Sequence, residues 1–463
     1  MKQFIGDKKF YKMVLAIAIP IMIQNGITNF VSMLDNLMVG RLGTEQMTGV
    51  AIANQLIFVF NLCIFGGLSG AGIFGAQFYG QKDYKGVQHV FRFKIMIGIV
   101  VTALVEMILI LFGDPLIQKF LHDSSSVGDL SLSLMHSRQY LMIMLIGLIP
   151  FTITQIYSST LRETGETVVP MKAGIMAVIV NLLFNTVLIF GLFGMPALGA
   201  RGAAVATVIA RFVECGMIVN WTHRHVEENP YIKGVYRSLH VPGNLTKQII
   251  IKGTPLMINE AAWAGGMTML MQCYSVRGLS VVAGLNIAST ISNVFNVVFI
   301  ALGSSVAIIV GQLLGAGEMK KAQDTAGKMI FFSVASCLVI GSILALISPL
   351  FPKFYNTSEE VKHYATWFIL ITAICMPQNA FMHATYFTLR SGGKTIITFL
   401  FDSVYVWVIS IPLAYALTRY TSISIIPIYF VCQFVDIIKC IIGFILVKKG
   451  VWLENITVSE ERI

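Results

Sequence analysis

The chain has 463 residues, of which 56% are apolar and only 12% are charged, and its mean hydropathy is +0.76. These values exclude an ordinary soluble globular protein and indicate an integral membrane protein. The formal net charge is +10, but the basic residues fall where a cytoplasmic membrane surface would attract them, so no nucleic-acid partner is implied.

Apolar stretches of about 20 residues predict an all-α protein with twelve transmembrane helices. The first stretch is too long for the apolar core of a cleavable secretory signal, so we keep it as a helix. The predicted spans cover residues 13–38, 48–78, 90–112, 138–160, 168–191, 201–220, 249–275, 281–313, 327–348, 364–388, 396–417 and 423–447.

The sequence carries two related copies of one pattern, about 235 residues apart. Six spans in each copy would give both copies the same orientation, and the expected fold is two pseudo-symmetric six-helix bundles. The repeated segments are Pro20–Asn25 with Pro255–Glu260, Gln77–Asp83 with Gln312–Glu318, and Leu161–Thr167 with Leu389–Thr395. The expected domains are an N-terminal bundle (1–221), a cytoplasmic linker (222–248), a C-terminal bundle (249–447) and a cytoplasmic tail (448–463).

The distribution of Lys and Arg predicts which side of the membrane holds the chain ends. Of these residues, 23 fall on the side of the two termini and 8 on the other side. The positive-inside rule therefore places both termini in the cytoplasm of a multi-pass protein of the cell (plasma or inner) membrane. The chain has no phosphate-binding Gly-x-x-x-x-Gly-Lys-Ser/Thr sequence, so uphill transport would draw on an ion gradient.

The repeated motifs have ordinary structural interpretations. In each Leu-Arg-x-x-Gly-x-Thr copy the Arg suits the membrane interface, the Gly suits a turn and the Thr suits a helix cap. Gly80 and Gly315 suit the ends of long spans, and Gln77 and Gln312 need hydrogen-bond partners within the protein. The seven cysteines lie in apolar spans at irregular spacing, which predicts neither disulfides nor a metal site.

Charged residues inside the spans are where function is expected, because an ionised Asp, Lys or Arg at the bilayer centre costs at least ~2.5–3.5 kcal/mol. Two pairs are spaced i to i+3, Arg211 with Glu214 and Asp436 with Lys439, and each is expected to pair on its own helix. Asp402 is expected to reach the interface. The charged residues taken as candidates, leaving out the basic residues near span ends that were counted with the connections, are Asp35, Glu106, Arg211, Glu214, Glu260, Asp402, Asp436 and Lys439.

Asp35 differs from the others because it ends a polar stripe on a helix with an internal proline. Gln24, Thr28 and Ser32 precede it at helical spacing, so this face is expected to meet something other than lipid. Pro20 removes a backbone hydrogen bond and permits a bend. The competing interpretation is that Asp35 only marks the outer end of its span, and spacing does not decide between the two.

Over nearly its whole length the chain resembles the multidrug and toxic compound extrusion (MATE) family of antiporters. The resemblance implies two six-helix bundles, a central cavity open to one side at a time, and export of lipophilic or cationic drugs in exchange for H⁺ or Na⁺. The matching segments are Pro20–Gly43 with Asp35, Gln77-x-x-Gly80, Leu161–Thr167, Asn181–Asn185 and Leu188–Gly191, with their second-copy counterparts.

The resemblance also implies roles for three polar residues. Asp35 matches the first-helix carboxylate whose occupancy by an ion or proton drives the cycle in that family, and Asn181 matches its polar fifth-helix neighbour. Asn185 departs from the pattern, because many relatives carry Asp there. One negative charge fewer favours proton coupling at Asp35 over strong Na⁺ binding. We therefore expect Asp35, Asn181 and Asn185 to form the coupling site, with no cofactor and no resident metal.

The expected substrate contacts follow the internal prolines Pro20 and Pro255, at which the two helices would bend. Glu260 resembles a seventh-helix acid used for cation recognition in the family, and Trp263 one turn later could hold a lipophilic cation. A monomer in the lipid bilayer is expected. The predicted substrate-binding residues are Gln24, Asn25, Asn259, Glu260 and Trp263.

Two other functions compete with drug export. A flippase for lipid-linked saccharides, from the same superfamily, would require a cationic central cavity. The candidate charged residues within the spans are instead mostly acids. An intramembrane serine protease would use Ser69, in Gly67-Leu-Ser69-Gly70, with His383 as its base. That reading requires the two side chains to meet within hydrogen-bond distance.

Overall fold

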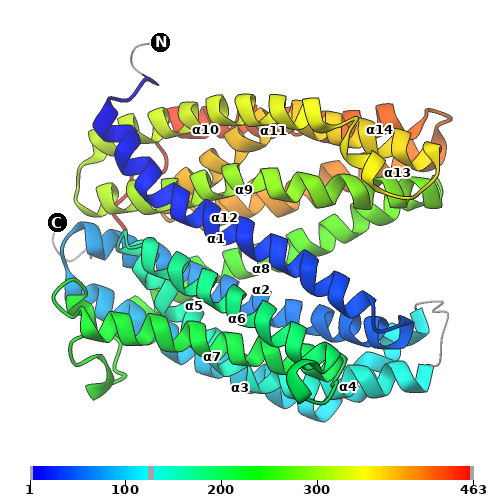
Figure 1. Cartoon of the computed structure of the whole chain (residues 1–463). Helices are drawn as coiled ribbons and strands as arrows, with labels where there is room; N and C mark the ends of the chain where they lie inside the picture. The colour runs from blue at the N-terminus through cyan, green and yellow to red at the C-terminus, as the bar shows by residue number, and fades with distance from the viewer. Residues whose placement is uncertain (1–3, 124–129, 459–463) are drawn as a thin grey trace. The chain divides into compact units, whose positions relative to one another are not determined.

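The computed structural model describes residues 4–123 and 130–458, which form helices and turns and no strand (Figure 1). The predicted all-α fold is confirmed. The α-helices are α1 (Lys8–Gly40), α2 (Thr44–Gly80), α3 (Tyr84–Asp123), α4 (Leu130–Ile146), α5 (Leu148–Glu163), α6 (Val168–Phe190), α7 (Ala200–Arg224), α8 (Gly243–Ser275), α9 (Leu279–Gly315), α10 (Met319–Ile347), α11 (Glu359–Ser391), α12 (Thr395–Phe399), α13 (Ile411–Tyr420), α14 (Ile425–Phe434) and α15 (Ile437–Lys448).

Within the described residues, ten helical stretches are long and apolar enough to cross a membrane, or eleven if the pair α4 and α5, bent by 46°, counts as one span. Helix α8 is not among them, although its 33 residues are long enough to cross. It carries Lys247, Lys252 and Glu260, which lower its apolar character. The prediction of a helical membrane protein is therefore confirmed, and the number of twelve spans stays a prediction.

Several of the long helices are interrupted where polar residues fall inside them. The chain runs from α12 to α13 through two π-helical segments, Leu400–Val404 and Val406–Ser410. A turn at Val435 and Asp436 separates α14 from α15. Pi-helical turns are rare and widen the helix locally, which changes the direction in which neighbouring side chains point.

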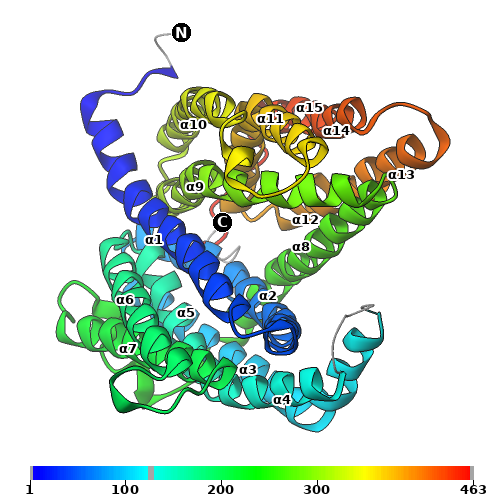
Figure 2. The same ribbon diagram turned by 45° about the vertical axis from the view of Figure 1, so that its right-hand side comes forward.

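The chain groups into two compact units that do not follow the sequence copies strictly. The N-terminal unit contains Ile23–Gly75 and Tyr84–Gln248, and the C-terminal unit contains Met1–Met22, Ala76–Asp83 and Ile249–Ile463. In the N-terminal unit α6 packs on α7, and in the C-terminal unit α9, α10 and α11 pack on one another (Figure 2). The start of α1 and the end of α2 thus pack with helices of the second copy.

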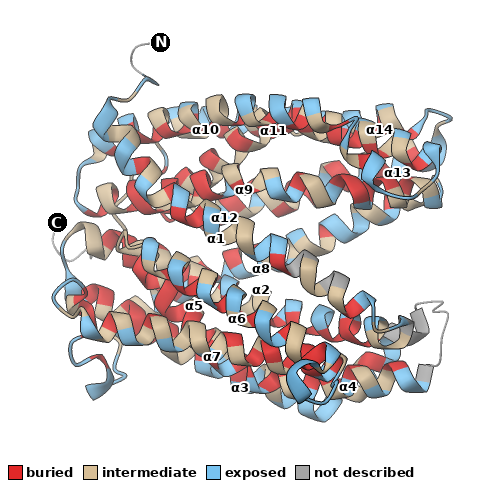
Figure 3. Ribbon diagram, in the orientation of Figure 1, coloured by how far each residue is buried: buried red, intermediate tan, exposed pale blue. Residues whose placement is uncertain are grey.

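Exposed residues occur along the helices of each unit (Figure 3), and many of them are large and apolar. Leu111 on α3 in the N-terminal unit is 65% exposed, and Leu346 on α10 in the C-terminal unit is 75% exposed. Continuous apolar surface of this kind marks contact with an apolar solvent rather than water. The helices satisfy their own backbone hydrogen bonds, as a segment in lipid must.

In the C-terminal unit the end of α2 crosses the end of α9 through two glycines. A Cβ added to Gly80 would overlap the backbone carbonyl oxygen of Gln312, and a Cβ added to Gly315 would overlap the carbonyl oxygen of Gln77. The two contacts are reciprocal. The repeated Gln-x-x-Gly motif therefore exists because neither helix tolerates a side chain at this close approach.

The linker between the copies is tied to α3 within the N-terminal unit. It contains two single-turn 3₁₀ helices, Pro230–Ile232 and Val235–Arg237. The guanidinium of Arg92 on α3 donates to the carbonyl of Val235 at 2.9 Å, and Gln88 donates to the carbonyl of Tyr231 at 3.0 Å. The linker is thus an ordered part of this unit.

We predict that Gly80→Ala and Gly315→Ala each destabilise the protein, because the added methyl group forces α2 and α9 apart. Overpacking of this kind costs about 1–3 kcal/mol, or roughly 5 °C in melting temperature. Gly216→Ala is the matched control, since Gly216 lies inside α7 with nothing within 4 Å of an added Cβ. The measurement is the melting temperature of each purified variant in detergent. Equal melting temperatures for all three would contradict the packing role of the two glycines.

Candidate functional site

The first candidate site lies in the N-terminal unit, where a carboxyl group on α1 meets two amides on α6. Asn185 Nδ2 donates to Asp35 Oδ1 at 2.6 Å and to Asn181 Oδ1 at 3.1 Å. Asn181 and Asn185 are four residues apart and share one face of α6, with exposed fractions of 6% and 1%. The structure therefore brings together the three residues that were predicted to form the coupling site.

The Asn181 amide fits this site in two orientations. With its oxygen toward Asp35, its nitrogen donates to Thr207 Oγ1 at 3.2 Å. With its nitrogen toward Asp35, it donates to the two carboxyl oxygens at 3.1 and 3.2 Å, and its oxygen accepts from Thr207. A carboxylate only accepts hydrogen bonds, whereas a carboxylic acid also needs an acceptor for its proton. The two orientations thus differ in whether Asp35 meets an acceptor or a donor, and the second gives up the bond from Asn185 Nδ2 to Asn181 Oδ1.

Asp35 has no cationic partner among the ion pairs found in the described part of the chain. By contrast, Glu163 in the same unit lies 2.6 Å from Lys94 Nζ, and both side chains are largely buried. Neutral amides donate hydrogen bonds but do not cancel a charge. Asp35 can therefore gain or lose a proton without breaking an ion pair, which Glu163 cannot.

Gln24, expected to contact substrate, is engaged within the N-terminal unit. Its Oε1 accepts from Arg162 Nη2 at 2.6 Å, and its side chain packs on Gly174 of α6. Asn25 beside it is half-buried. Arg162, the arginine of the first Leu-Arg motif, thus holds α5 against α1. The substrate roles of Gln24 and Asn25 stay predictions.

The second polar cluster lies in the C-terminal unit, between α8 and the π-helical segment. Asn259 Nδ2 donates to Asp402 Oδ2 at 3.0 Å, and Ser403 Oγ donates to Asn259 Oδ1 at 2.7 Å. Lys439 Nζ on α15 lies 3.7 Å from Asp402 Oδ1. The π-helical segment Leu400–Val404 carries Asp402 and Ser403, so both of these consecutive residues reach Asn259.

The expected pairing of Asp436 with Lys439 is wrong. Lys439 pairs with Asp402 instead, while Asp436 Oδ1 is buried without a hydrogen-bond partner in the described structure. The physical reason is the turn before α15, which puts Asp436 at the helix cap. The Asp402 side chain is only 26% exposed and belongs to this internal cluster. The expectation that it reaches the membrane interface is therefore wrong.

The expected pairing of Arg211 with Glu214 is also absent from the ion pairs of the described residues. Arg211 Nη1 donates to the carbonyl of Gly147 at 3.2 Å, and its guanidinium lies 4.9 Å from the ring centre of Phe151. Gly147 sits at the bend between α4 and α5, and its carbonyl also accepts from the backbone N–H of Phe151 at 3.2 Å. The guanidinium of Arg211 thus adds a second hydrogen bond to this carbonyl and packs on the ring of Phe151.

The remaining residues expected to bind substrate separate along α8. Asn259 is 2% exposed and its amide is used by Asp402 and Ser403, whereas Trp263 is 42% exposed. Glu260 is half-buried. Pro255 lies inside the same helix, as Pro20 lies inside α1. The roles of Asn259, Glu260 and Trp263 in substrate binding, and of the two prolines in helix bending, stay predictions.

The residues of the protease alternative have other partners. Ser69 Oγ donates to the carbonyl of Gly66 on its own helix at 3.0 Å, and the ring of His383 lies 4.7 Å from that of Phe299. Ser69 belongs to the N-terminal unit and His383 to the C-terminal unit. Within the described residues no cluster of His, Cys, Asp and Glu could hold a metal ion, and the seven cysteines are free.

Sequence reasoning missed Thr207 and the pair Asp402 with Lys439. Thr207 lies on α7, one turn before Arg211, and its hydroxyl contacts Asn181 at 3.2 Å. The available signal was a polar residue on α7, the helix that packs against the Asn181 face of α6. The partner of Lys439 had no local signal, because Asp402 is 37 positions away (439 minus 402) on another helix.

Long apolar helices enclosing buried carboxyl and amide groups define a multi-pass helical membrane protein of the transporter type. A sequence model of the MatE family matches residues 20–187 and 255–416, which lie in the two copies of the repeat. The match covers more than half of the chain. The chain therefore belongs to the MatE family.

Known relatives agree with this assignment over almost the whole length. A probable multidrug resistance protein NorM from Thermotoga maritima is 25% identical over 462 residues, which cover 98% of this chain and 95% of the relative. A probable multidrug resistance protein YoeA from Bacillus subtilis is 22% identical over 427 residues, covering 89% and 88%. Both relatives are named for multidrug resistance.

Solved structures show the same fold. An outward-facing multidrug resistance MATE family transporter of the MOP superfamily aligns with a TM-score of 0.85 at 17% identity, covering 98% of each chain. A MATE in complex with MaL6 aligns with a TM-score of 0.84 at 18% identity, also covering 98% of each chain. At these identities the likeness establishes the fold.

We predict that Asp402→Asn and Lys439→Met each destabilise the protein more than the double variant does. Each single change leaves a charge or a strong acceptor without its partner, at a cost on the order of 2 kcal/mol. This is less than for a fully buried pair, because the Asp402 side chain is 26% exposed.

The melting temperatures of the three variants give the coupling between Asp402 and Lys439. Lys362→Met is the control, because Lys362 pairs with the 89%-exposed Glu359, and exposed pairs contribute little. Additive effects of the two single changes would contradict the pairing.

Proposed function

We propose that this protein is a secondary active antiporter that exports lipophilic or cationic drugs and toxic organic compounds in exchange for H⁺ by alternating access. Membership of the MatE family and relatives named multidrug resistance proteins support this function. The observation that carries the coupling is the Asp35 carboxyl group, held on α1 by the neutral amides of Asn185 and Asn181.

Proton binding at Asp35 changes what the neighbouring amides can do. As a carboxylate, Asp35 accepts from Asn185 and from the inward-turned nitrogen of Asn181. As an acid, it offers a proton to the Asn181 oxygen, whose nitrogen then donates to Thr207. Protonation therefore removes the charge from the link between α1 and α6 and weakens its hydrogen bonds, which lets α1 shift at Pro20. Substrate leaves as the proton binds.

The donor set favours H⁺ over Na⁺ as the coupling ion. Hard cations are held by several oxygen ligands, commonly with more than one carboxylate. Here Asp35 supplies the carboxylate, and Asn185 directs its nitrogen rather than its oxygen toward it. A sodium ion would have to turn both amides and would remain less well neutralised than with Asp at position 185. No cofactor is needed beyond the coupling ion.

The transmembrane arrangement that suits this function has twelve spans with both termini in the cytoplasm. It counts α8 as a span and treats three interrupted stretches as one span each, namely α4 with α5, α12 with α13, and α14 with α15. The even number in each copy gives the two bundles the same orientation. The linker (222–248) and tail (448–463) then lie on the cytoplasmic side of a monomer in the cell membrane.

Substrate recognition in this proposal combines charge with an apolar surface. Glu260 attracts a cationic drug and Trp263 supplies an aromatic face. Gln24, Asn25 and Asn259 provide polar contacts on the two proline-containing helices. Because the amides of Gln24 and Asn259 already bond within their own units, substrate would compete with those bonds, which links binding to rearrangement.

We predict that Asp35→Asn abolishes proton-driven ethidium efflux, because an amide cannot exchange a proton, while the protein still folds. The assay uses proteoliposomes with H⁺ and Na⁺ gradients imposed separately, and the wild type should respond to the H⁺ gradient. Asp114→Asn is the matched control, since the Asp114 side chain is 44% exposed and pairs with Arg138 at 3.4 Å. Efflux by Asp35→Asn at the wild-type rate, or response to Na⁺ alone, would refute this coupling.

A further inference from the structure

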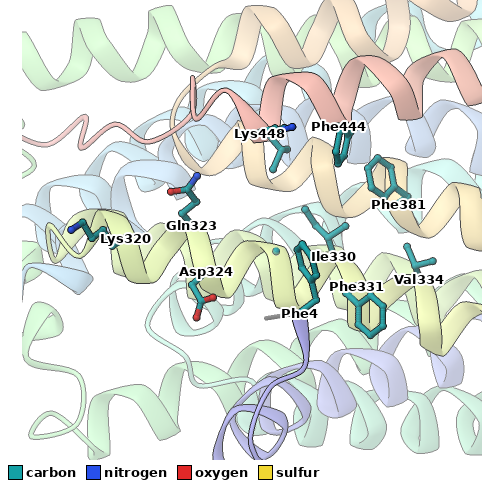
Figure 4. A pocket seen from close by; sticks show the side chains of 12 residues that line it. Phe4, Lys320, Gln323, Asp324, Ile330, Phe331, Val334, Phe381, Phe444 and Lys448 are labelled. Carbon is teal, nitrogen blue, oxygen red and sulfur yellow. The ribbon is translucent and has the colours of Figure 1, made fainter. Parts of the chain in front are cut away.

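A groove with apolar walls and a basic end lies along α10, α11 and α15 in the C-terminal unit (Figure 4). Its volume is about 800 Å³. In this view Lys320, Gln323 and Asp324 lie at one end, Phe331, Phe381 and Val334 lie toward the other, and Lys448 lies beside Phe444. The apolar walls are formed by Ile330, Phe331, Val334, Phe381 and Phe444, with Phe4 of the amino-terminal segment packed on Phe331.

The charges at the polar end favour an anion. Lys320 in the first turn of α10 and Lys448 at the end of α15 both line the groove and are exposed. Neither lies within ion-pair distance of a carboxylate in the part of the chain that the structure describes. Asp324, the acid at this end, is already paired with Lys328 at 2.5 Å. Both lysines can therefore meet a negative group, although Lys448 Nζ also lies 5.8 Å from the ring centre of Phe444.

The length of the groove suits one leaflet of a bilayer. Lys320 and Val334 are 14 residues apart on α10, which corresponds to about 21 Å of helix. Half of a bilayer's hydrocarbon core is about 15 Å thick. The distance from the lysine end to the far apolar wall thus matches a headgroup followed by an acyl chain.

We propose that this groove binds one anionic phospholipid of the cytoplasmic leaflet. Its phosphate lies between Lys320 and Lys448, and one acyl chain runs past Phe331 toward Val334 and Phe381. The side of the membrane rests on the proposed topology, in which α10 begins and α15 ends at the cytoplasmic face. Each lysine near an anionic headgroup adds an electrostatic attraction, so a site with two lysines should bind anionic lipids in strong preference to neutral ones.

The test compares phosphatidylglycerol with phosphatidylcholine on purified full-length protein by native mass spectrometry and by melting temperature. The wild type should retain phosphatidylglycerol in preference to phosphatidylcholine. Lys320→Ala with Lys448→Ala should lower that preference about tenfold or more. The matched control is Lys321→Ala with Lys449→Ala, which removes the same charge from neighbouring residues that do not line the groove.

Two further arms separate the groove from simpler explanations. Val334→Trp keeps both lysines and fills the apolar end, so it should also lower retention of phosphatidylglycerol. Glycerol phosphate alone should not reproduce the stabilisation by the lipid. Equal behaviour of the two double-lysine variants, unchanged retention in Val334→Trp, or full stabilisation by glycerol phosphate would each overturn the proposal. None of these readouts depends on drug transport.

A separate observation concerns the carboxyl-terminal strap, residues Trp452–Thr457, which follows α15 in the C-terminal unit. Trp452 is fully buried, and a Cβ added to Gly392 would overlap its carbonyl oxygen. Glu454 forms an ion pair with Lys394. Asn455 Nδ2 donates to the carbonyl of Gly315 at 3.0 Å. The strap is therefore seated on the ends of helices from the second sequence copy.

The strap also holds the end of α2, which belongs to the first sequence copy. Gln77 Nε2 donates to the carbonyl of Glu454 at 3.2 Å, and Gln77 Oε1 accepts from the backbone N–H of Ile456 at 2.9 Å. Gln81 Nε2 donates to Thr457 Oγ1 at 2.5 Å. The glutamine of the repeated Gln-x-x-Gly motif thus has a partner that its sequence did not reveal.

We infer that the strap is a latch that holds the end of α2 to the second sequence copy and releases it when the transporter opens to the cytoplasm. This inference rests on the proposed alternating access, which requires the two copies to separate at one end in each half-cycle. In the latch, the end of α2 leaves the C-terminal unit, so the bonds of Gln77 and Gln81 to the strap break together with the bond of Gln77 Nε2 to the carbonyl of Ser391 at 2.9 Å. Those of Lys394 and Gly315 to the strap can persist, because they lie within the second copy.

A pair of cross-links distinguishes these two sets of contacts. In a cysteine-free background that transports, a short thiol cross-linker joins Gln81→Cys to Thr457→Cys in one variant and Lys394→Cys to Glu454→Cys in the other. The first cross-link should lower ethidium efflux at least tenfold, with recovery after reductive cleavage of the linker. The second should leave efflux within about twofold of its uncross-linked value.

Transport by the uncross-linked variants checks the antiporter function independently of the latch. If the cross-link between positions 81 and 457 leaves efflux unchanged, the strap does not have to release α2. If both cross-links block efflux equally, the strap moves as a whole from both copies. Either result overturns the latch.

Discussion

The cost of leaving a polar or charged group without a partner in hydrocarbon governs the arrangement of this protein. It confines the described chain to helices, and it decides how the polar side chains within those helices are placed. Glu163 meets Lys94 and Asp402 meets Lys439, so these charges are neutralised where they lie. Asp35 differs from these two carboxyl groups, because its hydrogen-bond partner is an amide and not a cation. A group that is hydrogen-bonded but not neutralised is the one suited to exchange a proton.

The repeat places matching chemistry in both copies but does not make them equivalent. Gln24 of the first copy bonds Arg162 and packs on Gly174, whereas its counterpart Asn259 bonds Asp402 and Ser403. The carboxyl group of the second cluster is held by a lysine, and that of the first cluster is not. The duplication thus supplies one carboxyl group without a cationic partner and one that is paired with a lysine.

Much of the fold followed from local properties of the sequence. Apolar length predicted the long helices, and the repeated glycine and proline motifs predicted the duplication; Asp35, Asn181 and Asn185 were grouped through the family resemblance. What could not be predicted depends on geometry between distant segments. The partner of Lys439 is selected by the π-helical segment that carries Asp402, and Trp452–Thr457, expected to be a simple tail, is ordered by contacts with Gln77 and Gly392. The residue pattern within either segment does not predict which distant residues it contacts.

The central claim is that Asp35 carries the proton that is exchanged for cargo. Thermodynamic linkage requires that a cargo displaced by a proton must itself displace that proton when it binds. The most direct measurement is therefore proton release when ethidium is added to the purified wild-type protein in weakly buffered detergent solution. We expect release from the wild type and from Asp114→Asn, and none from Asp35→Asn at drug concentrations that saturate each variant. Equal proton release from Asp35→Asn, or drug binding by the wild type without release, would contradict the claim.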